Sequence, residues 1–333
     1  MKKLEVRKED LIFNLNLIRN KINGKSEIIA VVKGNGMGLG LIKFTKFLID
    51  QGIKFFAVAT PDEALALRKA EITEDILMMS EVVNENELKA LIENNIIITL
   101  GSLEEKQKTE EIAVSLGKQA RAHVNVDTGF SRYGFLWNDE DIFKAVKSTD
   151  NIKIEGCFTH FSKANDETWT MQQFSRINRI APSIKKINPD IKFHSCNSTA
   201  FLKYENMWQD YVRLGSCLQG RVLENNLGLK KVGSLKAEIV TIKYVRKGYN
   251  ISYSNEYTAK RDMRIATVNA GYIDGFNLKK AVDSFSLKTR IIDSLVGIKK
   301  IFIKDCLKVR VAGKSYKVLR KTWNVSCNYW YNK

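Results

Sequence analysis

The chain has 333 residues, 44% of them hydrophobic, and a formal net charge of +17, which predicts about two globular domains with a sizeable core. Its five cysteines are scattered and no apolar run is long enough to span a bilayer, so we expect a cytoplasmic protein without disulfides, metal site or membrane segment. No nucleic-acid-binding motif accompanies the positive charge, so we expect a basic site for phosphate and carboxylate groups rather than a nucleic-acid partner.

The first predicted strand, residues 28–33, is an apolar run rich in β-branched residues that ends at Lys33. The glycine-rich stretch 34–40 follows, so the lysine lies beside backbone that can approach a ligand closely. A solvated lysine at a strand end is the plain alternative. A desolvated lysine at this place can lose its proton near neutral pH and form a Schiff base with an aldehyde cofactor, and the rest of the chain favours that interpretation.

Apolar runs and helical segments alternate along the first two thirds of the chain. The predicted strands are residues 28–33, 55–59, 75–80, 96–101, 120–127, 152–160, 191–196 and 211–215. In one helical segment Thr60 or Asp62 can cap the helix, and Pro61 suits its first turn. Eight such strands predict a closed (β/α)8 barrel, with an open doubly wound parallel sheet as the alternative.

After Gly233 apolar and polar residues alternate, as in residues 235–245 and 263–270, and helical periodicity is weak. We therefore expect two domains. The first, residues 1–230, is a cofactor-binding (β/α)8 barrel, and the second, residues 231–333, is a mostly-β C-terminal domain.

Titratable and polar residues gather at the carboxyl ends of the predicted barrel strands, where barrel enzymes build their active sites. These residues are Lys33, Asp127, His160, His194, Asn197 and Arg213. A single histidine at such a place is usually a packed core residue, but two at one rim favour a functional role. His123 falls in mid-strand and is expected to be structural.

Two short segments after the last strands suit a phosphate group, which needs backbone N–H groups and small hydroxyls without steric cover. Each segment alone is no more than a helix cap or a turn. The first contains His194, Asn197 and Ser198, and the second contains Arg213, Gly215 and Ser216. Together with Lys33 they predict a phosphorylated aldehyde as the cofactor.

Several ordered motifs lie between residues 31 and 275, within a similarity that covers roughly residues 1–320, and include the lysine, one histidine and the arginine named above. They are Val31-Val32-Lys33-Gly34-Asn35-Gly36-Met37-Gly38-Leu39-Gly40, Val126-Asp127-Thr128-Gly129-Phe130-Ser131-Arg132-Tyr133-Gly134, Thr159-His160-Phe161, Val212-Arg213-Leu214-Gly215, Ser252-Tyr253-Ser254 and Gly271-Tyr272-Ile273-Asp274-Gly275. In this order they resemble the motifs of the alanine racemase family, pyridoxal 5′-phosphate enzymes that combine a barrel with a β domain.

The resemblance implies a homodimeric racemase that uses pyridoxal 5′-phosphate and binds a small amino acid. Lys33 then holds the cofactor and acts as the base on one face of the substrate, and Tyr253, supplied by the partner subunit, acts on the other. His160 and Arg213 assist Tyr253, and Arg213 also faces the cofactor nitrogen. The two phosphate segments contact the cofactor, and substrate binding falls to Arg132 and Tyr272.

We therefore expect an isomerase that interconverts L- and D-alanine and supplies D-alanine for cell-wall peptide. Two alternatives remain open. One is a serine racemase of related build, and the other is a cofactor-binding pseudoenzyme that keeps Lys33 but cannot deliver Tyr253.

Three features depart from the family pattern. Met37 replaces a phosphate-contacting tyrosine, and the lost hydroxyl weakens cofactor binding by about 0.5–1.5 kcal/mol. Asn125 replaces the lysine that many members carry in carbamylated form, and an anion can fill the gap. The family's late Met-Asp pair is missing, and a one-base shift at Trp323-Asn324 restores Gly-Met, so we expect a frameshifted, incomplete C-terminal domain with a weak dimer and low activity.

Overall fold

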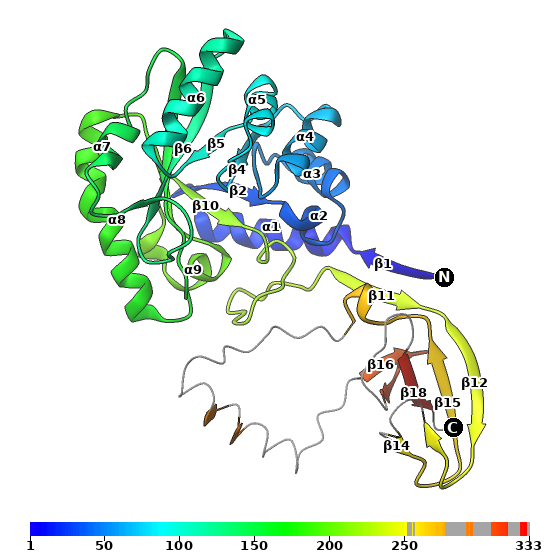
Figure 1. Ribbon diagram of the computed structural model, residues 1–333. Coiled ribbons are helices and arrows are strands. Elements are labelled where there is room, and N and C mark those ends of the chain that lie inside the picture. The colour runs from blue at the N-terminus through cyan, green and yellow to red at the C-terminus, as the bar shows by residue number, and fades with distance from the viewer. Residues whose placement is uncertain are drawn as a thin grey trace. The chain divides into compact units, whose positions relative to one another are not determined.

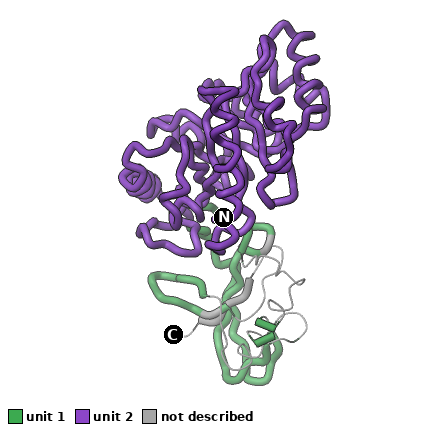
Figure 2. Tube along the Cα trace, turned by 90° about the vertical axis from the view of Figure 1, so that its left-hand side faces the viewer, with its two compact units in different colours: residues 1–5, 234–333 green, residues 6–233 purple. Residues whose placement is uncertain are grey.

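The computed structural model describes residues 1–251, 255, 257–276, 291–292, 294–295, 308–318 and 327–331 (Figure 1). The chain divides into two compact units, which Figure 2 draws in different colours. One unit comprises residues 6–233, and the other combines residues 1–5 with residues 234–333. None of the helices in the described part of the chain is long and apolar enough to cross a membrane.

The first unit contains the eight predicted parallel strands. They are β2 (Glu27–Val31), β3 (Phe55–Val58), β4 (Asp75–Met78), β5 (Ile98–Leu100), β6 (Ala120–Asp127), β8 (Ile152–Phe158), β9 (Lys192–His194) and β10 (Tyr211–Leu214). They form two sheets, in the orders β10-β2-β3-β4 and β5-β6-β8-β9, with the short β7 (Phe135–Leu136) beside β6.

Backbone hydrogen bonds connect the two sheets at both seams. At the first seam the Met78 amide donates to the Ile97 carbonyl at 2.8 Å, and at the second the Arg213 amide donates to the Cys196 carbonyl at 2.9 Å. The strands therefore close into a ring, which confirms the predicted (β/α)8 barrel and excludes the open sheet.

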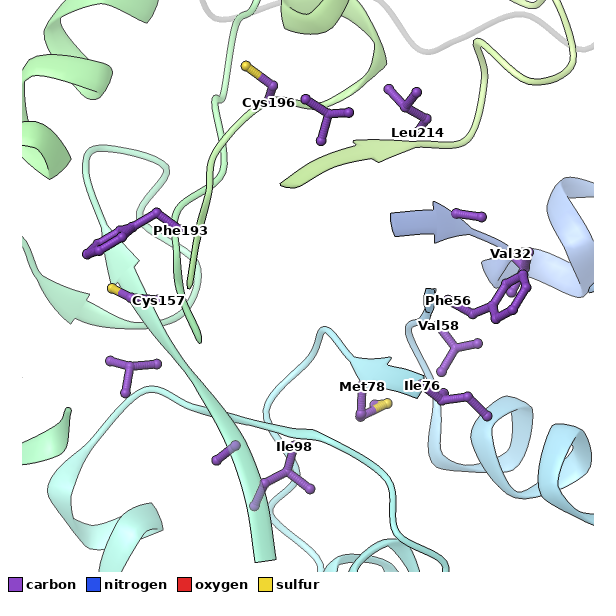
Figure 3. Close-up of a cluster of buried hydrophobic side chains, with 14 of the residues drawn as sticks. Val32, Phe56, Val58, Ile76, Met78, Ile98, Cys157, Phe193, Cys196 and Leu214 are labelled. Atoms are coloured by element: carbon purple, nitrogen blue, oxygen red, sulfur yellow. The ribbon is translucent and has the colours of Figure 1, made fainter. Parts of the chain in front are cut away.

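Alternate residues of the barrel strands face opposite sides, as the two-residue period of a strand requires. Val32, Phe56 and Ile76, labelled in Figure 3, belong to a large buried cluster. This cluster also includes helix residues such as Leu15 and Leu67. The other set forms a separate buried cluster, with members Ile29, Val31, Phe55, Ala57, Leu77 and Ile97. One set thus packs against the helices and the other fills the barrel, so these neighbouring strands need apolar residues on both faces.

Helices follow the strands and surround the barrel (Figure 1). They are α1 (Lys8–Ile22), α3 (Leu41–Asp50), α4 (Pro61–Lys69), α5 (Glu85–Glu93), α6 (Leu103–Leu116), α7 (Asp141–Ala145), α8 (Glu167–Ile187) and α9 (Ser198–Lys203). Of the two caps considered for α4, the structure uses Thr60, whose side chain accepts from the Glu63 amide. The side chain of Asn197 caps α9 in the same way, accepting from the amides of Thr199 and Ala200.

The second unit consists mainly of antiparallel strands, as predicted. β12 (Ile239–Val245) pairs with β15 (Met263–Val268), which pairs on its other side with β18 (Cys327–Tyr331). Three further pairs are β1 (Lys2–Val6) with β11 (Gly233–Ala237), β13 (Asn250–Ile251) with β14 (Tyr257–Thr258), and β16 (Lys308–Val311) with β17 (Lys314–Lys317). Tyr253 and residues 319–326 of the tail lie outside the described residues.

Candidate active site

Lys33 begins an unusual turn directly after β2. The turn, α2 (Lys33–Met37), is left-handed, because the five residues from Gly34 to Gly38 all have positive φ angles between 53° and 86°. Two of the five, Asn35 and Met37, are not glycine, and a left-handed conformation is costly for them. The Asn35 amide donates to the Glu63 carboxylate at 3.0 Å, which fixes the turn against α4. The lysine therefore begins a turn that is hydrogen-bonded to α4 at the rim of the barrel.

A cavity of about 270 Å³ opens at the carboxyl ends of the strands. It brings together several of the side chains singled out in the sequence, namely Lys33, Asn125, Asp127, Arg132, His160 and Arg213. A second cavity of about 170 Å³ is also lined by Lys33, His160 and Arg213, and its wall includes Asn197, Ser198, Gly215 and Ser216. The structure thus places the predicted lysine, arginine and phosphate segments around the same end of one barrel.

Arg213 is the buried centre of this end, with only 2% of its surface exposed. Its guanidinium donates to the carbonyls of Thr159 at 2.6 Å, His194 at 2.7 Å and Ser195 at 3.0 Å. The His160 Nδ1 lies 3.5 Å from the same guanidinium. Burial lowers the pKa of Arg213 to about 10, so the group is still a cation at neutral pH.

His194 lies beneath Arg213 and lines neither cavity. Its Nδ1 faces an N–H of Arg213 and must accept, so its Nε2 carries the proton and donates to the Nδ1 of His123 at 2.9 Å. We expected His194 among the cofactor contacts, whereas here it supports the arginine. His123, which is 2% exposed, has the structural place expected of it.

All three histidines are held neutral. Burial, reinforced by the positive charge of Arg213, lowers the pKa of His160 to about 3 and places that of His194 well below its usual range. Burial likewise lowers the pKa of His123 to about 4. At neutral pH the imidazoles therefore act as hydrogen-bonding groups and add no charge beside Arg213.

The environment of Lys33 makes it a better nucleophile than a solvated lysine. Burial lowers the pKa of its ammonium first, and the positive charges of Arg132 and Arg213 lower it further, against an opposing effect of Glu63. A lysine with a lowered pKa holds a larger fraction of neutral amine at neutral pH. The positive charges of Arg132 and Arg213 favour anionic groups, such as phosphate or carboxylate, in the cavity.

A loop after β6 carries Arg132. The Asp127 carboxylate holds the start of this loop by accepting from the amides of Gly129 at 2.7 Å, Phe130 at 2.8 Å and Ser131 at 3.0 Å. The Arg132 guanidinium lies over the Phe130 ring, 4.3 Å from its centroid. This aromatic support was not apparent in the sequence, where Phe130 reads only as part of a motif.

The far cavity wall is built from small residues. The Ser198 hydroxyl accepts from the amides of Gly215 at 3.1 Å and Cys217 at 3.3 Å, which joins the two predicted phosphate segments. A Cβ at Gly215 would lie 3.3 Å from both the Cβ and the carbonyl oxygen of Val31, and 3.5 Å from the Met37 Cε. Glycine therefore keeps side-chain atoms out of the cavity at this wall. Hydroxyls, an amide side chain and nearby cations are a donor set that suits a phosphate group.

Two predicted residues belong to the second unit. Tyr253, the expected second base, lies outside the described residues. Tyr272 begins the short helix η3 (Tyr272–Asp274), where the neighbouring Gly271 amide donates to the Asp274 carboxylate at 3.0 Å.

By architecture this is a two-unit enzyme of the (β/α)8 class, with its candidate active site at the carboxyl ends of the strands. Residues 6–221 match the family model of the alanine racemase N-terminal domain, and residues 232–293 match that of the alanine racemase C-terminal domain. The chain belongs to the alanine racemase family.

Individual relatives support the same assignment. The alanine racemase of Methanococcus maripaludis is 36% identical over 273 residues, which cover 79% of this chain and 73% of the relative. The alanine racemase of Halothermothrix orenii is 34% identical over 274 residues, which cover 80% of this chain and 72% of the relative. The solved structure of the Clostridium difficile 630 alanine racemase has a TM-score of 0.85 and 29% identity, and the match covers 100% of this chain and 83% of that one.

Proposed function

We propose that this protein is a pyridoxal 5′-phosphate-dependent racemase that interconverts L- and D-alanine. The observation that carries the proposal is the placement of Lys33, Arg132 and Arg213 around one cavity at the strand ends. Relatives named alanine racemase support the choice of alanine. Two similar solved alanine racemases carry cycloserine or L-Ala-P, with TM-scores of 0.82 and 0.80.

The residues present fit the cofactor. Lys33, whose pKa is lowered, is the attachment point, and the wall of Asn197, Ser198, Gly215 and Ser216 receives the phosphate. When bound, pyridoxal phosphate withdraws electrons from the substrate and makes the proton on its α-carbon acidic. Since Arg213 is already a cation, it disfavours protonation of a basic cofactor atom placed beside it.

The chain's own residues would move protons and orient the substrate. Lys33 removes or returns the α-proton on one face, because its lowered pKa gives it basic character near neutral pH. Arg132 binds the substrate carboxylate, for which its planar fork is suited. We assign the second base to Tyr253 of the partner subunit in a homodimer, with His160 as its hydrogen-bonding neighbour.

The setting we propose is the cytoplasm, where the product supplies D-alanine for cell-wall peptide. The buried thiols of Cys157, Cys196 and Cys217 are free, which suits a reducing compartment.

The test is a racemisation assay on purified protein with added pyridoxal phosphate, run with L-alanine, D-alanine and L-serine. We expect racemisation of alanine in both directions, and its loss in Lys33→Ala. Preferred turnover of serine would replace the substrate assignment. Tight cofactor binding without racemisation of either amino acid would overturn the proposal and favour the cofactor-binding pseudoenzyme.

A further inference from the structure

The loop that carries Arg132 is anchored at both ends by carboxyl groups. Asp127 holds its beginning, as described above. At its other end the Gly134 amide donates to the Oε1 of Glu81 at 2.8 Å, although the two residues are 53 positions apart in the chain. Glu81 follows β4, and the neighbouring Met79 and Ser80 line the active-site cavity. Glu81 therefore connects the loop to a barrel strand at the site.

Gly101 makes room for the Glu81 carboxyl, and Gly134 makes room for the close approach of the loop to Asn125. A Cβ at Gly101 would lie 1.7 Å from the Oε1 of Glu81, so the carboxyl occupies space that any larger residue would fill. A Cβ at Gly134, whose φ is +99°, would lie 2.6 Å from the carbonyl oxygen of Asn125. Asn125 itself lines the cavity. The Glu81 carboxyl thus sets where Gly134 rests against the cavity wall.

The carboxyl of Glu105 lies beside that of Glu81, because both carboxyls contact Gly101. Glu105 is fixed there, because it accepts from the Gly101 amide at 2.6 Å and its own amide donates to the Ser102 hydroxyl at 3.1 Å at the start of α6. Two neighbouring carboxyls repel when both are ionised, so ionisation of the pair is disfavoured. Burial raises the pKa of both groups, and with the charge of Glu105 it raises that of Glu81 to about 7.

The other charged groups near Glu81 and Glu105 either contact other partners or favour the protonated form of the two carboxyls. On α6, Glu104 adds negative charge beside Glu105, and Lys108 is paired with Glu85 at 3.1 Å. On the loop, the Asp127 carboxylate accepts backbone amides, and the Arg132 guanidinium lies over Phe130.

We propose that Glu81 is a positioning residue for Arg132: its carboxyl, which lies beside that of Glu105 against Gly101, holds Gly134 and thereby fixes the far end of the substrate-binding loop. The link to substrate binding rests on the function proposed above. Removal of this carboxyl leaves the Gly134 amide without its acceptor and frees that end of the loop. Substrate affinity should then fall.

Hydrogen exchange of the loop tests the contact between Glu81 and Gly134 without any activity measurement. We would compare wild type, Glu81→Ala, Glu81→Gln and the exposed Glu87→Gln control by following a peptide that covers residues 128–137. Glu81→Ala should lose protection, whereas the control should exchange like wild type. In Glu81→Gln the side-chain amide oxygen can still accept from the Gly134 amide, so its protection should stay close to that of wild type.

Kinetics tests the consequence for the substrate. Glu81→Ala should raise KM for L-alanine about fivefold, the factor of one ordinary hydrogen bond, with a smaller change in kcat, and Glu81→Gln should keep KM near that of wild type. The positioning role is overturned if the exchange of Glu81→Ala follows wild type, or if its KM equals that of wild type. Inactive wild type would instead refute the proposed function, and the exchange data would still decide the role of Glu81.

Discussion

Replacing Arg213 by leucine tests how much this arginine stabilises the barrel. Three backbone carbonyls, those of Thr159, His194 and Ser195, accept from its guanidinium. Leucine removes every donor, so the carbonyls of Thr159 and Ser195 and the Nδ1 of His194 each lose a partner, while the His194 carbonyl keeps the Thr159 amide at 3.4 Å. At about 1 kcal/mol for each lost partner, the low end of the usual range, the loss of unfolding free energy is about 3 kcal/mol.

The free energy of unfolding of Arg213→Lys should lie between those of Arg213→Leu and wild type. An ammonium has three donors but lacks the planar fork that reaches carbonyls on separate strands, so we expect a loss of about 1–2 kcal/mol. Arg221→Leu is the matched control, because Arg221 is exposed in the same unit. Its free energy of unfolding should stay within about 0.5 kcal/mol of wild type.

The assay is urea unfolding of the cofactor-free protein, followed by helical circular dichroism. The helices α1 to α9 belong to the barrel unit, so this signal reports on the unit that holds Arg213. If Arg213→Leu destabilised the unit no more than the Arg221→Leu control does, the reasoning would be refuted, since the three acceptors would then find other donors at no cost.

Three further predictions follow from the site. The folded pKa values of His123 and His160 lie below the unfolded value, so protonation favours the unfolded state. The free energy of unfolding should therefore fall as pH drops from about 6.5 towards 4, by about 1.4 kcal/mol per pH unit for each histidine. His123→Gln should reduce that slope in urea unfolding, and an unchanged slope would contradict the prediction. Borohydride treatment of the protein with pyridoxal phosphate should add the cofactor mass to Lys33, and mass mapping to another lysine would contradict its role. Tyr253→Phe should lower alanine racemisation about 100-fold or more without weakening cofactor binding, whereas near-normal turnover would remove Tyr253 from the mechanism.

The barrel could be predicted because its strands are apolar on both faces and each ends in turn residues. The run before Lys33 shows this clearly: Ile29 and Val31 face the barrel interior while Ala30 and Val32 face the helices, and all four are buried. Lys33 and Arg213 follow or occupy such strands, so the position of both at the rim was visible from the order of elements.

Contacts that depend on three-dimensional proximity could not be predicted. The sequence places His194 at a strand end but does not reveal that its ring supports Arg213 from below. Nothing in the sequence joins Glu81 to Gly134, since neither carries a motif for the contact and many residues separate them. The left-handed turn after Lys33 is suggested by its glycines, but the positive φ of Met37 follows only from the folded backbone.

The pairing of β1 with β11 has a consequence for synthesis of the chain. Residues 2–6 are synthesised before the barrel segment, yet their partner strand begins at Gly233. At about 5–20 residues per second, roughly 10 to 50 seconds pass before the partner is made. During that time the barrel segment can fold, while the first strand waits with its backbone unpaired. A C-terminal fragment expressed alone would lack this strand, so the second unit should be produced separately only with residues 1–6 added back.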